Sequence, residues 1–324
     1  MKLDIISIGA ATRDVFLRSK SIRVVRDESF STGEAECFAL GSKIEVDEIV
    51  FETGGGGTNT AVSFARQGLK IGYVGKIGAT DARGVEIIRA LKQERVDTSR
   101  VIKDRKRMTG YSVLLLTPRG ERTVLVYRGA SADVDPNNMT PRCVNAEWIY
   151  VSSLGGRLDT HRKIWRLAVK SQTKIAWNPG ASELAHGLEV LRPLLKQAAL
   201  VSLNQEEAAR LLGRGRHQDE SVFQDIRPLV GGVTLLTMGA EGALAGRANE
   251  AWHAGTRPIR VVDTTGAGDA FGSGFVGRLM VTDSIPEALI YGTANAESVI
   301  QHVGAKNGLL RGRRPSSPVT VTKR

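Results

Sequence analysis

The stretch "DTTGAGDAFGSG", from Asp263 to Gly274, combines two carboxylates with residues that carry little or no side chain. It follows an apolar, strand-like segment, and apolar side chains recur every four residues after position 267, which indicates a helix. Free backbone amides at a helix N-terminus attract anions, and small residues let a phosphate reach them. The sequence therefore predicts a phosphate-binding helix start formed by Gly266, Ala267 and Gly268.

Asp269 lies in the first turn of this expected helix. A carboxylate beside a bound phosphate can accept the proton of an attacking hydroxyl group, a contribution typically worth about 10²–10⁴-fold in rate. The alternative is that Asp269 only complements the helix dipole and that the glycines form a turn. The pattern is neither a P-loop nor a dinucleotide-binding motif, since the chain has no G-x-x-x-x-G-K-[ST] and no G-x-G-x-x-G after a strand.

The elements around this stretch indicate an α/β fold. From residue 148 to residue 237, short apolar strands alternate with amphipathic helices, which predicts a doubly wound, mostly parallel central sheet covered on both faces. In such sheets, ligands bind beyond the carboxyl ends of the strands. Residues 15–53 and 109–130 are instead rich in strand and turn patterns and predict a small β-sheet lid. We expect one domain over residues 1–310, followed by a flexible basic tail over residues 311–324.

Four motifs resemble signatures of the ribokinase/PfkB family. "DTTGAGDAF" resembles its C-terminal signature D-T-x-G-A-G-D, and "GGGGTNTAVSFARQG" (residues 54–68) is similar to its N-terminal signature G-G-x-x-x-N-x-A. "NQEEA" (204–208) resembles its N-x-x-E element, and "TMGAEG" (237–242) resembles the turn of its nucleotide site. Order and spacing agree over roughly residues 3–310, so the chain is identified as a member of this family of carbohydrate and nucleoside kinases.

The resemblance implies a ribokinase-like fold and ATP-dependent transfer of the γ-phosphate to a hydroxymethyl group of a sugar or nucleoside. Asp269 would be the catalytic base, and the amides of the preceding glycine stretch would stabilise the developing charge. Glu207 would help to hold Mg²⁺ through water. Asp263, with the neighbourhood of Gly304, would hold a monovalent cation such as K⁺. The residues expected at the ATP site are Asn204, Thr237, Gly239, Gly242 and Asn295.

For the acceptor, the resemblance points to Asp14, since the family places an aspartate just after the first strand. The other residues expected to bind sugar hydroxyls are Gly54, Gly55, Gly56 and Asn59. The lid would close over the acceptor and exclude water, and it could also pair two subunits into a homodimer. Gly56 stands where ribokinase-like members often carry lysine, so the resemblance does not fix ribose as the acceptor.

Two other functions are compatible with these motifs. One is a phosphosugar kinase of the same family, in which Arg122 and Arg128 of the lid would meet the phosphate of the acceptor; a solvated lid face is the other explanation for these arginines. The second is a non-catalytic sugar- or nucleotide-binding protein on the same fold, against which the intact base and anion-binding glycines argue.

Charge and composition set further limits. The net charge is +11, but residues 306–324 contain six cations and no acid, so the excess indicates a basic tail rather than a nucleic-acid surface. These cations are Lys306, Arg311, Arg313, Arg314, Lys323 and Arg324. No apolar run approaches the roughly 18 residues of a membrane span. The only cysteines, Cys37 and Cys143, favour a reducing compartment, so we expect a cytoplasmic protein with a small-molecule partner.

Overall fold

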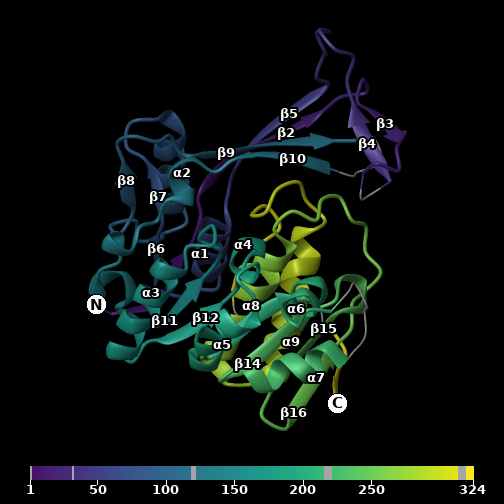
Figure 1. Cartoon of the computed structure of the whole chain (residues 1–324). Coiled ribbons are helices and arrows are strands. Elements are labelled where there is room, and N and C mark those ends of the chain that lie inside the picture. The colour runs from purple at the N-terminus through teal and green to yellow at the C-terminus, as the bar shows by residue number, and fades with distance from the viewer. Residues whose placement is uncertain (1, 31–32, 118–121, 215–220, 313–318) are drawn as a thin grey trace.

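The computed structural model describes residues 2–30, 33–117, 122–214, 221–312 and 319–324. Figure 1 shows a large body of helices around a central sheet, from which a strand-rich part extends. The strand-rich part comes from the first 130 residues, whereas most of the large body comes from the rest of the chain.

Within the described residues, nine strands form the central sheet in the order β17-β16-β15-β14-β13-β12-β11-β1-β6. Six neighbouring strands run parallel, namely β6, β1, β11, β12, β13 and β14. At the other edge, β15, β16 and β17 add antiparallel pairs. Strand order reverses beside β1, the kind of position at which open sheets bind ligands. The bounds are β1 Leu3–Ile8, β6 Ile71–Val74, β11 Ala146–Val151, β12 Lys174–Trp177, β13 Leu200–Asn204, β14 Val233–Thr237, β15 Ala243–Arg247, β16 Glu250–Ala254 and β17 Val321–Lys323.

Helices cover both faces of this sheet, as the doubly wound prediction requires. Residues of β1 alternate between two buried clusters: Ile6 and Ile8 belong to one, and Ile5 belongs to the other. The first cluster contains α3 Leu158–Lys170, α5 Leu188–Gln197, α6 Gln205–Leu211 and α7 Ser221–Ile226. The second contains α1 Gly56–Arg66, α2 Ala82–Gln93, α8 Ala267–Thr282 and α9 Ile285–Val299.

A separate four-stranded sheet, called the lid below, overlaps the expected segments 15–53 and 109–130, although β2 begins before residue 15 and β5 ends after residue 53. Its order is β10-β9-β2-β5, with bounds β2 Thr12–Arg18, β5 Glu48–Gly54, β9 Gly110–Leu116 and β10 Arg122–Tyr127. Phe16, Leu114 and Leu116 form its small core, against which Val50 and Val303 pack. A hairpin of β3 Arg23–Arg26 and β4 Glu34–Cys37 extends from it, and the predicted turn at residues 118–121 lies outside the described residues.

The end of the chain differs from the expected flexible tail. Val321–Lys323 form β17 and pair with β16, where Lys323 is opposite Trp252 and its Nζ lies 5.7 Å from the indole ring centroid. β-branched residues at 321 and 322 suit an edge strand, which the basic composition of this segment obscured. Residues 313–318 of the predicted tail lie outside the described residues. Among the helices that the structure describes, none has the length and apolar character needed to span a membrane.

Candidate active site

The start of α8 is open, as an anion-binding helix end has to be. Gly266 is its N-cap in the left-handed region (φ 78°), and no side chain caps the helix. A Cβ at Gly266 would overlap Ala305, so only glycine fits this position. A Cβ at Gly268 would meet nothing within 4 Å. The first amides of α8 can therefore be approached by a ligand.

The first turn of α8 separates two cavities. Ala267 and Gly268 line the larger one, about 650 Å³, and Asp269 lines the smaller one, about 250 Å³. They are called the large cavity and the small cavity below. A phosphoryl group bound at the start of α8 would thus lie between the large cavity and the small cavity.

The carboxylate of Asp269 is half-buried and accepts a hydrogen bond of 2.8 Å from Asn59 Nδ2 in α1. Burial raises the pKa of Asp269, while the Asn59 bond and the positive charge of Lys306 oppose this rise. A carboxylate that faces a cavity and has a raised pKa is suited to take a proton.

Lys306 is a buried cation that sequence reasoning missed, because we counted it with the basic tail. Its Nζ donates to Thr53 O, to Thr53 Oγ1 at 3.1 Å and to Thr58 Oγ1 at 2.9 Å. Burial lowers the pKa of Lys306 to about 8, against the opposing effects of carboxylates that include Asp14 and Asp269. The ammonium therefore ties the end of lid strand β5 to α1 and interacts electrostatically with Asp269.

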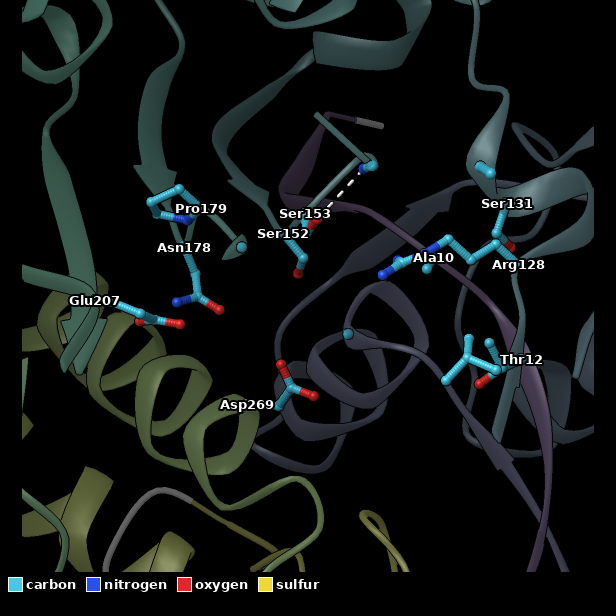
Figure 2. A pocket seen from close by; sticks show the side chains of 15 residues that line it. Ala10, Thr12, Arg128, Ser131, Ser152, Ser153, Asn178, Pro179, Glu207 and Asp269 are labelled. Atoms are coloured by element: carbon cyan, nitrogen blue, oxygen red, sulfur yellow. Dashed lines mark hydrogen bonds between the residues drawn. The ribbon is translucent and has the colours of Figure 1, made fainter. Parts of the chain in front are cut away.

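The small cavity lies beyond the carboxyl ends of β1, β11 and β12 and beneath the lid. Figure 2 shows Asn178 and Glu207 on one side, Thr12 and Arg128 on the opposite side, and Asp269 between them. Among the described residues that line it, none is aromatic, and the polar ones also include Ser131, Ser152 and Ser153. The cavity thus offers hydroxyl, amide and charged groups to a small polar ligand.

The predicted acceptor glycines have different places. Gly56 lines the small cavity, where a Cβ would lie 3.1 Å from Ser152 Oγ and 3.3 Å from Asp269 Oδ1. Gly54 and Gly55 lie behind it: a Cβ on Gly54 would overlap the Asp14 carboxylate, and Gly55 has φ 91°. Glycine at 56 keeps the cavity open, whereas its two neighbours allow the lid strand to approach the sheet.

Asp14 does not line the small cavity; Thr12, two residues before it on β2, does. Burial raises the pKa of Asp14, and hydrogen bonds with the Thr12 and Ser112 side chains oppose the rise. Asp14 Oδ1, Asn59 Oδ1 and Ser152 Oγ are buried without a hydrogen-bond partner among the described residues. Buried polar atoms of this kind cost free energy until a ligand or water satisfies them.

Glu183 holds the wall of the small cavity in shape, and no sequence motif indicated it. This fully buried carboxylate accepts bonds of 2.8 Å from Leu154 N and Gly156 N at Oε1. Oε2 accepts from Ser153 Oγ at 2.8 Å and from Gly180 N at 3.0 Å. One carboxylate thereby joins the loops that follow β11 and β12.

The large cavity brings together Thr237, Gly239 and Gly242, three of the residues predicted for ATP. It lies between the short 3-10 helix η5 Gly239–Glu241, residues 256–261, α8 and α9. Gly242 has φ 93°, and a Cβ there would overlap Ala254 O, so glycine is required where this turn meets β16.

Asn295, predicted at the ATP site, does not line the large cavity. Its side chain is buried, Nδ2 donates to Ala270 O at 2.7 Å, and Oδ1 accepts from Leu310 N at 2.9 Å. Both ends of the amide are used inside the protein, so Asn295 joins α8, α9 and the segment that follows.

Asn204 and Glu207 cap α6 reciprocally: Asn204 Oδ1 accepts from Glu207 N at 2.7 Å, and Glu207 Oε2 accepts from Asn204 N at 2.9 Å. Glu207 also lines the small cavity, and burial raises the pKa of its carboxyl group.

Asp263 is buried, and its oxygens accept bonds from Thr265 N at 2.9 Å and from Gly304 N at 2.9 Å.

Comparison with known proteins agrees with this arrangement. Residues 4–311 match the pfkB family of carbohydrate kinases. The chain is 30% identical over 238 residues to the fructokinase of Salmonella typhimurium, which covers 70% of this chain and 76% of that protein. It is 26% identical over 274 residues to the ribokinase of Staphylococcus aureus, which covers 82% and 88%. A probable sugar kinase of Rhizobium etli shares the fold, with a TM-score of 0.78 at 23% identity over 95% of this chain and 97% of that one.

A mostly parallel sheet with a β lid and two cavities that meet at one helix start is the arrangement of a two-substrate transferase. Because the match spans nearly the whole chain, the protein belongs to the pfkB family of carbohydrate kinases. The fold class and the kinase class predicted from the four motifs are thereby confirmed.

Proposed function

We propose that this protein transfers the γ-phosphoryl group of ATP to a hydroxymethyl group of a monosaccharide. The observation that carries the proposal is the meeting of two cavities at the first turn of α8, with Asp269 on one side and Ala267 and Gly268 on the other. Relatives named ribokinase, fructokinase and aminoimidazole riboside kinase support this reaction class.

The acceptor hydroxyl, bound in the small cavity, gives its proton to the Asp269 carboxylate while its oxygen bonds to the γ-phosphorus. The bond between that phosphorus and the β–γ bridging oxygen breaks, and ADP leaves. The amides of Gly266, Ala267 and Gly268 donate to the phosphoryl oxygens and stabilise their negative charge. Asn59 and Lys306 favour the ionised form of Asp269, which is the form that can take the proton.

The small cavity favours a monosaccharide over a nucleoside. Its volume of about 250 Å³ lies below the roughly 300–1,000 Å³ of sites for drug-sized ligands. None of the described residues that line it offers an aromatic ring on which a base could stack. The unpartnered oxygen of Ser152 and the side chain of Thr12 line this cavity and are suited to bind sugar hydroxyls. Asp14 and Asn59, predicted for the acceptor, also carry unpartnered oxygens but are not among the lining residues.

The residues near Glu207 fit a magnesium ion. Glu207 uses only Oε2 for a hydrogen bond among the described residues, and its pKa is raised because burial is not offset by a counter-charge. A hydrated Mg²⁺ beside Oε1 would supply that charge and would neutralise phosphate oxygens when bound. Asn204 commits Oδ1 to the cap, which leaves its amide NH₂ for a phosphate.

Asp263 fits a K⁺ site less well than its position in the motif indicates. Both of its oxygens already accept backbone N–H groups, from Thr265 and Gly304. We assign Asp263 to ordering the loop before α8, and a K⁺ ion would have to be held mainly by backbone carbonyl groups.

The lid is a suitable surface for a homodimer. Apolar side chains that are about half exposed cluster on β5 and β10, namely Ile49, Phe51, Val124, Leu125, Val126 and Tyr127. Exposed apolar area of this kind favours association, which light scattering of the purified protein would reveal as twice the chain mass.

Two free thiols, Cys37 and Cys143, support the cytoplasm as the compartment.

The reaction is tested by incubating the full chain with MgATP and separate panels of monosaccharides and nucleosides while ADP formation is followed. We expect acceptor-dependent ADP formation with at least one sugar and a product heavier by one phosphoryl group in mass spectrometry. Binding of a sugar without ADP formation above the acceptor-free rate, across all panels, would instead support a non-catalytic binding protein.

A further inference from the structure

Arg128 stands where the lid rejoins the main body, between β10 and the short 3-10 helix η1 Gly129–Ala132. Its side chain lines the small cavity. In Figure 2 it lies across the cavity from Glu207 and Asn178, and Asp269 lies between the two sides. A ligand whose hydroxyl faces Asp269 would therefore have its other end within reach of the guanidinium.

The cations around Arg128 are paired with carboxylates. The carboxylate of Asp133, five residues further along the chain, forms ion pairs with Arg157 (2.6 Å), Arg107 (3.5 Å) and Lys76 (3.7 Å). Arg13, on lid strand β2, pairs with Glu86 at 3.0 Å.

Arg128 itself makes no ion pair or side-chain hydrogen bond with the described part of the chain. Arg128 is exposed and its side chain lines the cavity, so its N–H donors can meet a ligand there. The other charged residues among those lining the cavity are carboxylates: Glu207 lies across the cavity from Arg128, and Asp269 lies between the two sides. A planar, always charged guanidinium in this position is suited to a carboxylate or a phosphate, which it can bind through two parallel hydrogen bonds.

Ser152 adds a second feature of a built site. Its side chain is only 5% exposed, it lines the same cavity, and its Oγ has no partner among the described residues. The cavity thus offers a base at one end, an unsatisfied hydroxyl beside it and a free cation at the opposite wall. A neutral sugar would satisfy the first two groups, whereas the exposed guanidinium would keep only water as its partner.

We propose that Arg128 binds an anionic group of the acceptor, a carboxylate or a phosphate, so that the preferred acceptor is a sugar acid or a sugar monophosphate. This inference rests on the proposed kinase function and narrows its substrate class. The reaction is unchanged: the acceptor hydroxyl loses its proton to Asp269 and receives the γ-phosphoryl group, and ADP leaves. Arg128 sets specificity by holding the end of the acceptor that does not react.

The test compares kcat and KM of the full chain with MgATP and three arms of acceptors matched in carbon number. These are neutral aldoses and ketoses, the corresponding aldonates and 2-keto-aldonates, and sugar monophosphates. We expect one anionic arm to exceed the neutral arm in kcat/KM by at least about 10-fold, and the arm that responds identifies carboxylate or phosphate as the ligand. Sodium chloride should reduce this preference.

The variants Arg128→Gln and Arg128→Lys test the residue itself. Arg128→Gln should raise KM for the anionic acceptor about 10- to 100-fold, with kcat nearly unchanged and with little effect on neutral sugars. Arg128→Lys should restore part of the loss, since it keeps the charge without the planar fork. Arg18→Gln is the matched control, because Arg18 is another lid arginine but pairs with Glu48 on the exposed surface.

The outcomes separate this inference from the function on which it rests. Turnover of neutral sugars with no preference for anions, or an anionic preference that survives in Arg128→Gln, would overturn the role of Arg128 and leave the kinase intact. No ADP formation in any arm would overturn the kinase proposal and the inference with it. An anionic preference that is lost in Arg128→Gln and kept in Arg18→Gln supports both.

Discussion

Asn59 Nδ2 and Asp269 Oδ2 are joined by a 2.8 Å hydrogen bond that spans 210 residues of sequence. The bond connects the helix that follows the N-terminal glycine run with the first turn of α8. It favours the ionised form of a carboxylate whose burial favours the protonated form. The two glycine-rich motifs of the chain therefore meet at one place, where a residue of the first opposes the rise that burial causes in the pKa of Asp269 in the second.

Replacement of Asp269 by asparagine removes the proton acceptor and keeps nearly the same shape. We expect kcat to fall about 10²- to 10⁴-fold, while the dissociation constant of ATP changes little because Asp269 does not line the large cavity. Steady-state kinetics and calorimetric titration with ATP measure the two quantities. A kcat within a few-fold of the wild type would remove Asp269 from the role of base.

Replacement of Asn59 by leucine removes the hydrogen bond that opposes the raised pKa of Asp269. The pKa should rise further, so the acidic limb of the kcat profile should move to higher pH, since activity needs the ionised base. The profile is measured between about pH 4 and pH 8 with saturating acceptor. An acidic limb that stays in place, or moves to lower pH, contradicts this coupling.

Replacement of Lys306 by methionine removes a buried ammonium with a pKa of about 8, faced by Asp14, Glu52 and Asp269 and by the like charge of Arg66. We expect a lower kcat at neutral pH, because the charge that favours ionised Asp269 is lost. Above pH 8 the wild-type enzyme should lose activity as Lys306 deprotonates, and the variant should lack this limb. A basic limb that persists in the variant would assign it to another group.

The same residue gives a stability test with a defined sign. The pKa of Lys306 falls from 10.5 when the chain is unfolded to about 8 when it is folded, so between these values the unfolded chain binds more protons. The contribution of Lys306 to the free energy of unfolding should therefore rise with pH over that interval. Denaturant unfolding of the wild type and of Lys306→Met at pH 8 and pH 10 measures it. Lys20→Met is the control, since the Lys20 side chain is 90% exposed.

Replacement of Glu183 by glutamine places an NH₂ group against two N–H or O–H donors of the cavity wall. The free energy of unfolding should fall by about 1–3 kcal/mol, and KM for the acceptor should rise while KM for ATP stays near normal. Glu189→Gln, at a side chain that is 81% exposed, is the matched control. Equal changes in both KM values would show that Glu183 does not act on the small cavity alone.

Replacement of Gly56 by valine fills the small cavity, because a Cβ alone would already lie 3.1 Å from Ser152 Oγ and 3.3 Å from Asp269 Oδ1. We expect kcat/KM for the acceptor to fall roughly 10²-fold through misplacement of the hydroxyl, with ATP binding retained. An unchanged KM for the acceptor would place the acceptor elsewhere.

The fold and the position of Asp269 in the first turn of a glycine-rich helix start could be predicted from sequence because their signals are local. Period-two strands, amphipathic helices and the glycines before Asp269 each occupy a few consecutive residues. Gly266, Gly242 and Gly55 carry positive φ values that only a glycine adopts easily, so sequence marks them directly.

The remaining parts of the site depend on contacts between distant segments. Lys306 resembles a solvated tail lysine until β5 and α1 surround it, and Glu183 resembles a surface acid until four donors from two loops meet it. Asn295 shows the opposite case, since it was expected to contact ATP. In the structure its amide instead donates to Ala270 O of α8 and accepts from Leu310 N.

The order of these parts along the chain has a consequence for synthesis on the ribosome. The first 130 residues supply the lid, α1 and one side of the small cavity, whereas Ser152, Asn178 and Glu207 of its other walls come later, followed by Asp269 and Lys306. Since a nascent chain emerges from its N-terminus, the lid segments leave the ribosome before the residues of the other walls. The lining of the small cavity is therefore complete only once Asp269 has emerged, and we expect phosphoryl transfer only from chains that extend past Lys306.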